Sequence, residues 1–225
     1  MRLVDLGFGN AGLYLCDRVL RRLSGARAFI QRYYLVAQPV GIPMRLPQRL
    51  GAGFRVRPIA SRDPEAQSFP RPPAVIAARY AQGSTCLALF HDETLAGFIW
   101  LCPGSYLEDE VRCAFTPAPA GQVVWDYDFY ILPEHRNSVA FMKLWSAAMA
   151  HLRGQGVTWS ASRISAFAPA SIAAHNRLGA VRVGQAFFFV FFSLQLMVAT
   201  LPPFLHLSAS RGSRPALKVQ APTGN

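Results

Sequence analysis

Hydrophobic and polar positions follow a helical period near the start of the chain. Apolar residues recur every three or four positions within residues 10–24, and three arginines line the other side of this stretch. Asn10 suits the start of such a helix and Gly25 suits its end. An apolar, aromatic run at residues 29–40 then predicts a strand. We therefore predict a basic helix and strand extension over residues 1–50, with the apolar stripe packed on the protein or, alternatively, the helix lying on an anionic membrane surface.

From residue 54 onward, short apolar strands alternate with amphipathic helices. The predicted strands cover residues 54–59, 85–90, 95–102, 123–132, 157–167 and 181–192, and the predicted helices cover residues 73–82, 138–153 and 169–178. A short polar turn between the second and third strands predicts a β-hairpin. This order predicts a mixed sheet with helices on its faces, in one domain over residues 51–198.

A phenylalanine-rich segment closes that domain. Residues 186–205 are nearly free of charge and are long enough for a transmembrane helix, but their aromatic content and Pro202-Pro203 favour a core strand. A membrane-anchored or interfacial element is the alternative, and the phenylalanines could also line a pocket for an acyl chain longer than acetyl. Residues 199–225 are basic and are predicted to form a disordered tail.

Charge is distributed unevenly along the chain. The net charge is +11, hydrophobic residues make up 52% and charged residues 16%, which is typical of a folded protein. No Asp or Glu follows Glu134, whereas nine Lys or Arg do. A region without carboxylates suits an anionic ligand, such as a nucleotide phosphate, a membrane surface or nucleic acid.

The cysteines give no sign of a metal or a disulfide framework. Cys16, Cys86, Cys102 and Cys113 are scattered, form no CxxC pair and have no matching histidine spacing. We predict reduced thiols and no metal site. Because the N-terminal segment also lacks a secretory pattern, we predict a cytoplasmic protein, with peripheral attachment to the inner membrane face as the alternative.

Two strand–helix junctions carry the most specific pattern. The first is the segment Ile131-Leu132-Pro133-Glu134-His135-Arg136-Asn137-Ser138-Val139-Ala140, in which a strand ends in an aliphatic-x-Pro step before a basic loop and a helix. The second is the segment Ser171-Ile172-Ala173-Ala174-His175-Asn176-Arg177-Leu178-Gly179-Ala180, a short helix that ends in Gly.

In order and spacing, these junctions resemble those of the GNAT superfamily of N-acyltransferases, over roughly residues 54–192. The resemblance implies an α/β (α+β) fold with a mixed, mostly antiparallel twisted sheet flanked by helices. It also implies acetyl-CoA or another acyl-CoA as co-substrate, and no metal.

The resemblance assigns the first junction to coenzyme A. A helix N-terminus offers unpaired N–H groups and the positive end of its dipole to a pyrophosphate. The predicted cofactor-binding residues are therefore Arg136, Asn137, Ser138, Val139 and Ala140, with Ser171 on the second helix. The strand edge at Tyr130, Ile131 and Leu132 would pair with the pantetheine arm.

The chain departs from the family pattern at positions that bear on this binding. The family prefers glycine or alanine where this chain has Asn137, Val139 and Phe141, and asparagine where it has Ala168. Only a small side chain lets a backbone approach a phosphate closely. We therefore expect the Val139 and Phe141 side chains to point away from the cofactor, or the cofactor to sit differently.

The same resemblance suggests how the chemistry is divided. His175 occupies the position of a family tyrosine that protonates the departing CoA thiolate, and imidazole can fill that role. The alternative is a core histidine bonded to Ser171. Asp126 and Asp128 are two apart on one strand, so we expect them to share a face with Tyr130. They could act as general base, recognise a cationic acceptor, or lie at a solvated sheet edge.

The substrate side is less sharply defined. Trp159 and Arg163 lie on a strand whose polar residues alternate, which suggests the wall of a groove. Arg163 could bind an anionic acceptor group or a cofactor phosphate, or pair with Asp126 or Asp128. The acidic residues 108–110 are predicted to form a solvated loop.

We therefore predict an N-acyltransferase in which a small-molecule or peptide amine attacks an acyl-CoA directly. The alternative is a non-catalytic GNAT-like CoA-binding or interaction module, associated with a membrane. Weak membrane-surface association and a homodimer are left open. We expect no nucleic-acid partner, because no basic motif is interleaved with aromatic residues.

Overall fold

The computed structural model describes residues 3–42, 51–136, 138–210 and 212–222. These residues form two compact units, each assembled from separate stretches of the chain. Unit 1 comprises Met1–Gln38, Ser105–Ala118 and Ala161–Asn225, and unit 2 comprises Pro39–Gly104 and Pro119–Ser160. These units cut across the predicted boundaries at residues 50 and 198, because both ends of the chain belong to unit 1.

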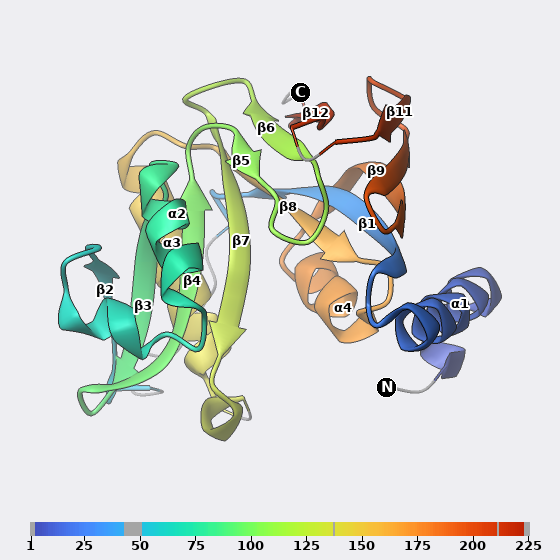
Figure 1. Cartoon of the computed structure of the whole chain (residues 1–225). Helices are drawn as coiled ribbons and strands as arrows, with labels where there is room; N and C mark the ends of the chain where they lie inside the picture. Colours follow the sequence, from blue (N-terminus) through green and yellow to red (C-terminus); the bar gives the residue numbers. More distant parts are fainter. Residues whose placement is uncertain (1–2, 43–50, 137, 211, 223–225) are drawn as a thin grey trace. The chain divides into compact units, whose positions relative to one another are not determined.

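Unit 2 is an antiparallel sheet with one helix on each face (Figure 1). The strand order is β7-β4-β3-β2, and the bounds are β2 (Phe54–Ile59), β3 (Thr85–His91), β4 (Thr94–Cys102) and β7 (Val123–Ile131). The helices are α2 (Pro73–Ala81) and α3 (Ala140–Gly154), with the 3-10 turns η2 (Pro64–Ser68) and η3 (Pro133–His135). Its fully buried side chains include Trp100, Trp125, Phe98, Leu89, Ile99, Leu144 and Leu152.

Unit 1 has a five-strand sheet, a three-strand sheet and two helices. The larger sheet has the order β11-β10-β9-β1-β8, with bounds β1 (Ala28–Pro39), β8 (Trp159–Ser165), β9 (Val181–Phe191), β10 (Leu194–Ala199) and β11 (Leu205–Ser208). The smaller has the order β12-β6-β5, with bounds β5 (Tyr106–Leu107), β6 (Ala114–Ala118) and β12 (Ala216–Gln220). The helices are α1 (Phe8–Ser24) and α4 (Pro169–Arg177), and η1 (Leu3–Leu6) precedes α1.

The predicted mixed, mostly antiparallel sheet with flanking helices is confirmed, and so are the hairpin and the phenylalanine-rich strand. Two expectations about the ends of the chain are wrong. β1 is an interior strand, antiparallel to β9 and next to β8, rather than part of a peripheral extension. The C-terminal segment forms β11 and β12 instead of a disordered tail. β12 is held by parallel pairing to β6, a long-range contact with no local sequence signal.

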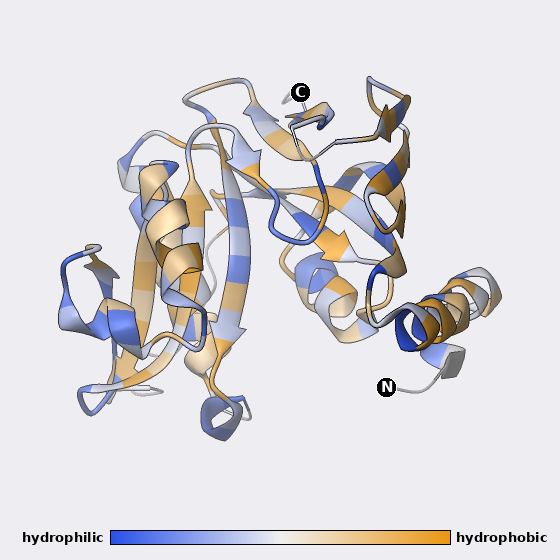
Figure 2. Cartoon of the chain, in the orientation of Figure 1, coloured by the Kyte–Doolittle hydropathy of each residue, from blue (hydrophilic) through white to orange (hydrophobic). Residues whose placement is uncertain are grey.

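The predicted apolar stripe of α1, formed by Leu13, Cys16, Leu20 and Leu23, packs only in part, because Leu13 and Leu20 are half-buried whereas Cys16 and Leu23 are exposed. Within α1, all of which is described, Asp17 is the buried residue. Leu23, which belongs to the predicted packing stripe, is 81% exposed. Figure 2 shows the apolar residues along this helix.

A β-bulge interrupts β7. Trp100 pairs with Tyr127 and Phe98 pairs with Tyr130, so three steps along β7 match two steps along β4. The extra residue is accommodated at Asp128, which has a φ of 47°. After the bulge, Phe129 packs on Phe141 of α3, at a ring-centroid distance of 4.9 Å.

The Asp128 side chain joins the bulge to α2 and the loop before it. Its Oδ1 accepts a hydrogen bond from Arg71 Nη2 at 2.5 Å, and its Oδ2 accepts from Arg79 Nη1 at 2.5 Å and from Arg71 Nε at 2.9 Å. The side chains of Arg79 and Asp128 are 5% and 14% exposed. A carboxylate shared by two arginines in such a place is a structural clamp, because each charge needs the others to offset its desolvation.

Gly97 is expected to be intolerant of a larger side chain. A Cβ at this position would lie 2.6 Å from the Tyr130 carbonyl oxygen and 2.8 Å from Ile131 Cδ1. We expect Gly97→Ala to lower the free energy of unfolding by about 2 kcal/mol in urea denaturation, because β4 and β7 must separate. Gly104→Ala is the control, since a Cβ there meets no described atom within 4 Å. Equal stability of the two variants would contradict the close approach.

The clamp gives a second stability prediction. Asp128→Asn should lower the free energy of unfolding by about 3 kcal/mol, because it removes the carboxylate charge that Arg71 and the buried Arg79 share. The matched control is Glu93→Gln, which breaks the ion pair with Arg55 at a site where both side chains are at least 80% exposed. The control should change stability by less than about 0.5 kcal/mol. A similar small loss at Asp128 would show that the clamp does not stabilise the fold.

Candidate functional site

The junction between β7 and α3 is built as a polar turn over a helix start. Leu132 N–H donates to the Ala96 carbonyl at 2.9 Å, which ends the pairing of this strand with β4. Ser138 Oγ donates to the His135 carbonyl at 2.7 Å and accepts from Ala140 N–H at 3.1 Å. One polar side chain therefore organises the loop and the first turn of α3.

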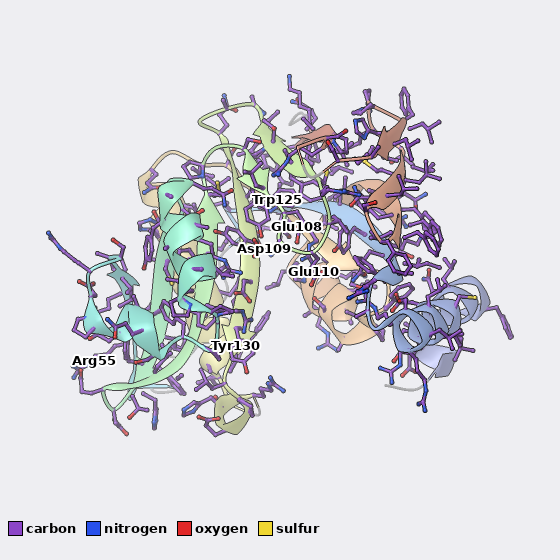
Figure 3. All side chains as sticks on the ribbon, viewed as in Figure 1. Arg55, Glu108, Asp109, Glu110, Trp125 and Tyr130 are labelled. Carbon is purple, nitrogen blue, oxygen red and sulfur yellow. The ribbon has the colours of Figure 1, made fainter. Side chains whose placement is uncertain are left out.

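Arg136 is the exposed cation of this loop. Its Nε donates to the Ile131 carbonyl at 3.2 Å, and its guanidinium lies 5.7 Å from the centre of the Tyr130 ring. Within the described residues its two terminal nitrogens make no hydrogen bond, so they can meet an anion. Figure 3 labels Tyr130 near the end of β7.

The two bulky residues at the small-residue positions point into unit 2. A Cβ added to Gly51, where φ is 81°, would lie 2.8 Å from Val139 Cγ2, so Val139 packs against that glycine. The Phe141 ring contacts Phe129 and lies parallel to Trp145 at 6.4 Å. Both side chains are therefore directed at the protein, as the sequence required if the backbone is to receive a phosphate. Asn137, the third such position, lies outside the described residues.

α3 adds a favourable field for an anion at this loop. The helix has 15 residues, no acidic residue in its first turn and His151 and Arg153 in its last turn. Its first N–H groups lack intrahelical acceptors, and the helix dipole adds positive potential there. The loop and helix start thus have the chemistry of a phosphate site.

The expected common face for Asp126, Asp128 and Tyr130 is wrong because of the bulge. Tyr127 and Asp128 are consecutive, yet both contact Arg79 on the α2 side. Asp126 therefore lies on the other face, where Ser160 Oγ donates to its Oδ2 at 2.6 Å. The Asp126 residue is 3% exposed. The structure brings Asp128 to Tyr130, but not Asp126.

Arg163 is part of an internal ion pair in unit 1. Its Nη2 and Nε donate to the two carboxylate oxygens of Glu108 at 2.7 and 3.0 Å, and its guanidinium stacks on Tyr33 at 4.5 Å. Burial acts to lower the pKa of Arg163, but the Glu108 charge outweighs it and the net shift is upward. The partner is thus Glu108 rather than Asp126 or Asp128, and the acidic loop is not simply solvated.

Tyr33 extends this cluster and was not singled out by the sequence. Its hydroxyl donates to Glu110 Oε2 at 2.6 Å, while burial raises its pKa, with further contributions from the charges of Glu108 and Glu110 against that of Arg163. Tyr33 is therefore a neutral donor. Its aromatic neighbours in sequence predicted a strand but not this polar contact.

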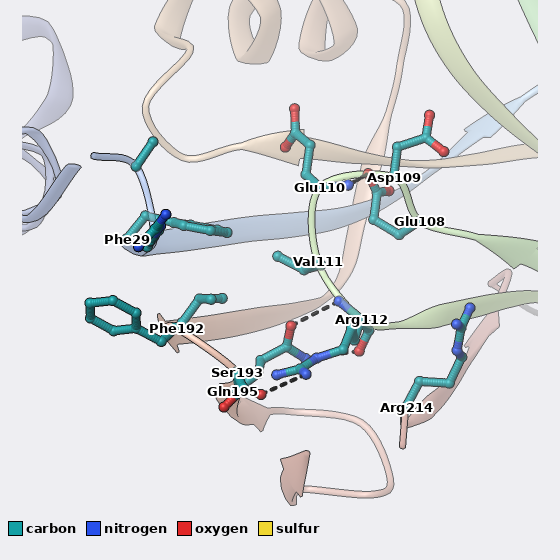
Figure 4. A pocket seen from close by; sticks show the side chains of 13 residues that line it. Phe29, Glu108, Asp109, Glu110, Val111, Arg112, Phe192, Ser193, Gln195 and Arg214 are labelled. Atoms are coloured by element: carbon teal, nitrogen blue, oxygen red, sulfur yellow. Dashed lines mark hydrogen bonds between the residues drawn. The ribbon is translucent and has the colours of Figure 1, made fainter. Parts of the chain in front are cut away.

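The acidic loop borders a hollow in unit 1 (Figure 4). The hollow has a volume of about 600 Å³, and its lining includes Asp109, Glu110, Phe29, Phe192 and Arg214. Arg112 closes one side, because it donates to the Ser193 carbonyl at 2.7 Å. The mixture of carboxylates, an arginine and aromatic rings suits a polar ligand with a cationic group.

The second junction places His175 on a helix that has no buried residue. The core-histidine alternative is therefore wrong, although the expected bond to residue 171 exists: Nδ1–H donates to the Ser171 carbonyl at 2.8 Å. With Nδ1 protonated, only Nε2 can deliver a proton, and it carries one only in the imidazolium form. Trp159, at the start of β8 in unit 2, is half-buried, and its backbone N–H donates to the Gln122 carbonyl at 3.1 Å.

Among the described residues there is neither a membrane-spanning helix nor a metal-binding cluster. They hold no helix that is long and apolar enough to cross a membrane. The same part of the chain holds no group of three or more His, Cys, Asp or Glu side chains placed to bind a metal ion.

Comparisons with known proteins bear on the fold. No protein-family model matches the sequence, and no curated protein matches it. Among solved structures, the chain is similar to a conserved protein of unknown function from Staphylococcus epidermidis ATCC 12228, with a TM-score of 0.52, 11% identity, and coverage of 78% of this chain and 67% of that one.

A second solved structure is a protein assigned to the GNAT family of acetyltransferases from Novosphingobium aromaticivorans DSM 12444. Its TM-score is 0.50 and its identity 16%, and the match covers 72% of this chain and 64% of that one. This chain thus spans about two thirds of the length of either structure. At these identities the likeness bears on the fold alone, and it shows that the chain has the GNAT fold.

Proposed function

We propose that this protein transfers an acyl group, acetyl or longer, from acyl-CoA to the amine of a small molecule or peptide in the cytoplasm. The observation that carries the proposal is the β7–α3 junction. It combines an exposed guanidinium at Arg136 with an acid-free helix start, and its two bulky side chains, Val139 and Phe141, are turned into unit 2.

The proposed cofactor site uses these features in order. Arg136 and the loop at Ser138, Val139 and Ala140 take the CoA pyrophosphate. The Ser138 N–H donates to the His135 carbonyl and the Ala140 N–H to Ser138 Oγ, so the Val139 N–H is the donor offered at these three positions. The pantetheine arm extends along β7 at Tyr130, Ile131 and Leu132 as an added strand. Ser171 is assigned no cofactor contact, and its role is to accept a hydrogen bond from His175 through its carbonyl. Arg163 is not retained as an acceptor-binding residue, because its guanidinium is paired with Glu108.

The bulge suggests where the thioester carbonyl is polarised. A bulge leaves one residue without a regular ladder partner and re-aims the backbone there. We propose that a backbone N–H at Asp128 or Phe129 donates to the carbonyl oxygen as the amine attacks. The strained φ of Asp128 is held by the clamp, so this donor is positioned before the substrate binds.

The reaction needs a base that takes a proton from the acceptor ammonium group and an acid that protonates the CoA thiolate. Asp128 is occupied by Arg71 and Arg79, so Asp126 is the carboxylate that we retain as the base for the ammonium proton. His175 would return a proton to the CoA thiolate through Nε2. The bond between the acyl carbon and the acceptor nitrogen forms as the bond between the acyl carbon and the CoA sulfur breaks.

A non-catalytic CoA-binding module is the second candidate function. It is favoured by the engagement of both carboxylates, since Asp126 is buried against Ser160 and Asp128 is clamped. It shares the cofactor site with the first candidate and differs only in turnover. Release of free CoA in the presence of any amine excludes it.

The cofactor site is tested by isothermal titration with CoA. Arg136→Gln should raise the Kd for CoA by about tenfold or more, because a charge-assisted contact to the pyrophosphate is lost. Binding of pantetheine, which has no pyrophosphate, should be unchanged. The control is Arg62→Gln, an exposed arginine in the same unit. If the wild-type chain binds neither CoA nor acetyl-CoA at millimolar concentration, the proposed function is rejected.

The role of His175 is tested by acetyl-CoA turnover with a panel of amines. His175→Ala should lower kcat by about a hundredfold and leave the KM for acetyl-CoA little changed, because only the protonation of the leaving thiolate is lost. The assay detects the CoA thiol, so Cys16→Ser, which removes the exposed protein thiol, is the background. His206→Ala is the matched control, a partly exposed histidine in the same unit. A raised KM with unchanged kcat would assign His175 to binding instead.

A further inference from the structure

The side of α1 that packs on unit 1 combines apolar contacts, such as that of Tyr14 with Phe167, with several buried polar ones. The buried Asp17 carboxylate accepts hydrogen bonds from Ile30 N–H at 2.8 Å and from Arg21 Nε. Asn10, on the same side, donates to Tyr34 Oη at 3.0 Å and accepts from Arg32 at 2.9 Å. A carboxylate is an unusual residue on the packed side of a surface helix, which is normally apolar throughout.

The opposite side of α1 is apolar and exposed. Phe8, Leu15, Val19 and Leu23 are 101%, 49%, 56% and 81% exposed. At about 100° per residue, these four positions fall within an arc of about 80° centred almost opposite Asp17. A continuous apolar stripe therefore runs along the helix and has no partner among the described residues of the chain.

A second apolar area lies on the outer face of the larger sheet of unit 1. The outward-facing positions of β9, β10 and β11 include Phe191, Leu194, Val198, Leu205 and Leu207, each between 45% and 65% exposed. Leu194 pairs with Phe191 and Val198 pairs with Leu205, so these side chains form rows across the three strands.

Helix and sheet face meet at a small hollow. Leu13 of α1 lines it together with Phe187 and Val198 of the sheet, and its volume is about 280 Å³. At the C-terminal end of β9, Phe192 N–H donates to the carbonyl of Arg27, the residue before β1, at 2.8 Å. We call the stripe of α1 and the outer face of β9–β11 together the apolar surface. Monomeric proteins seldom expose many large apolar side chains to water on one side of the molecule.

Basic side chains outnumber acidic ones around the apolar surface, although Asp109 and Glu110 line the hollow next to Arg27 and Phe192. Arg18 and Arg22 are exposed on one flank of α1, and Arg27 is exposed beside Phe192. The acid of α1, Asp17, is neutralised by Arg21, and Asp5 lies before the helix. The stretches of unit 1 contain thirteen Arg or Lys and five Asp or Glu, so its field favours an anionic partner.

We propose that the apolar surface binds the face of an anionic lipid bilayer. The apolar side chains of α1 and the sheet face enter the boundary between headgroups and acyl chains, while Arg18, Arg22 and Arg27 reach the lipid phosphates. A second copy of the chain fits less well, because a two-fold contact would bring the same arginines together. The inference is independent of acyl transfer.

The test uses the full chain and vesicles of phosphatidylcholine alone or mixed in equal parts with phosphatidylglycerol. Cys16 is exposed on α1, whereas Cys86, Cys102 and Cys113 are buried. Burial raises the pKa of Cys113 to about 12 and that of Cys86 further, so a polarity-sensitive fluorophore should label Cys16 selectively. Its emission should shift to the blue with the anionic vesicles, less with the neutral ones, and less at high salt.

Variants separate the apolar and electrostatic parts. Val19→Ser with Leu23→Ser should lower the partition coefficient on anionic vesicles about tenfold or more. Arg18→Gln with Arg22→Gln should lower it about fivefold for each charge, and only on anionic vesicles. Ile42→Ser is the matched control, because Ile42 is 52% exposed but lies in unit 2. Unchanged thermal unfolding would show that the variants remain folded.

Three outcomes would overturn the proposal. The first is that the folded protein does not float with anionic vesicles in low salt. The second is that Ile42→Ser weakens flotation as much as the α1 variants. The third is a dimer in light scattering, without vesicle binding, that the Val19 and Leu23 substitutions convert to monomer; this would assign the apolar surface to a second copy.

Discussion

The clamp of Asp128 between Arg71 and Arg79 is the interaction on which unit 2 most depends. It fixes α2 against β7 and holds a positive φ at a residue that is not glycine. Because the bulge lies there, it also sets the faces for the rest of β7: Phe129 turns to α3, and Asp126 is separated from Asp128. The geometry of the strand that precedes the cofactor loop therefore follows from one buried ionic contact.

The loop between β7 and α3 shows how the fold accommodates bulky residues where the resemblance predicts small ones. Glycine is favoured where a phosphate approaches a backbone, yet Val139 and Phe141 stand at these positions. Gly51, which has a positive φ, leaves room for the Val139 side chain. Phe129 and Trp145 contact the Phe141 ring. The small residue is therefore Gly51, which the Val139 side chain contacts, and not a residue of the loop itself.

Unit 1 combines two unlike surfaces. Its interior polar cluster of Arg163, Glu108, Tyr33 and Glu110 is closely paired. Its exterior has an apolar stripe on α1 beside an apolar sheet face, bordered by arginines. Most buried side chains of unit 1 are apolar, such as Leu35, Phe188 and Leu217, so the polar cluster and the exposed apolar area are local exceptions to the usual distribution.

The sequence by itself determined the order of strands and helices from residue 54, the hairpin and the position of the loop between β7 and α3. These are encoded by local periodicity, by caps and by Pro133. Only the tertiary structure decided that β1 is interior, that β12 pairs with β6, that Arg163 meets Glu108 and that Asp126 turns from Asp128. The physical reason is that pairing partners, a single bulge and the buried side of an amphipathic helix depend on residues distant in sequence, which no local pattern records.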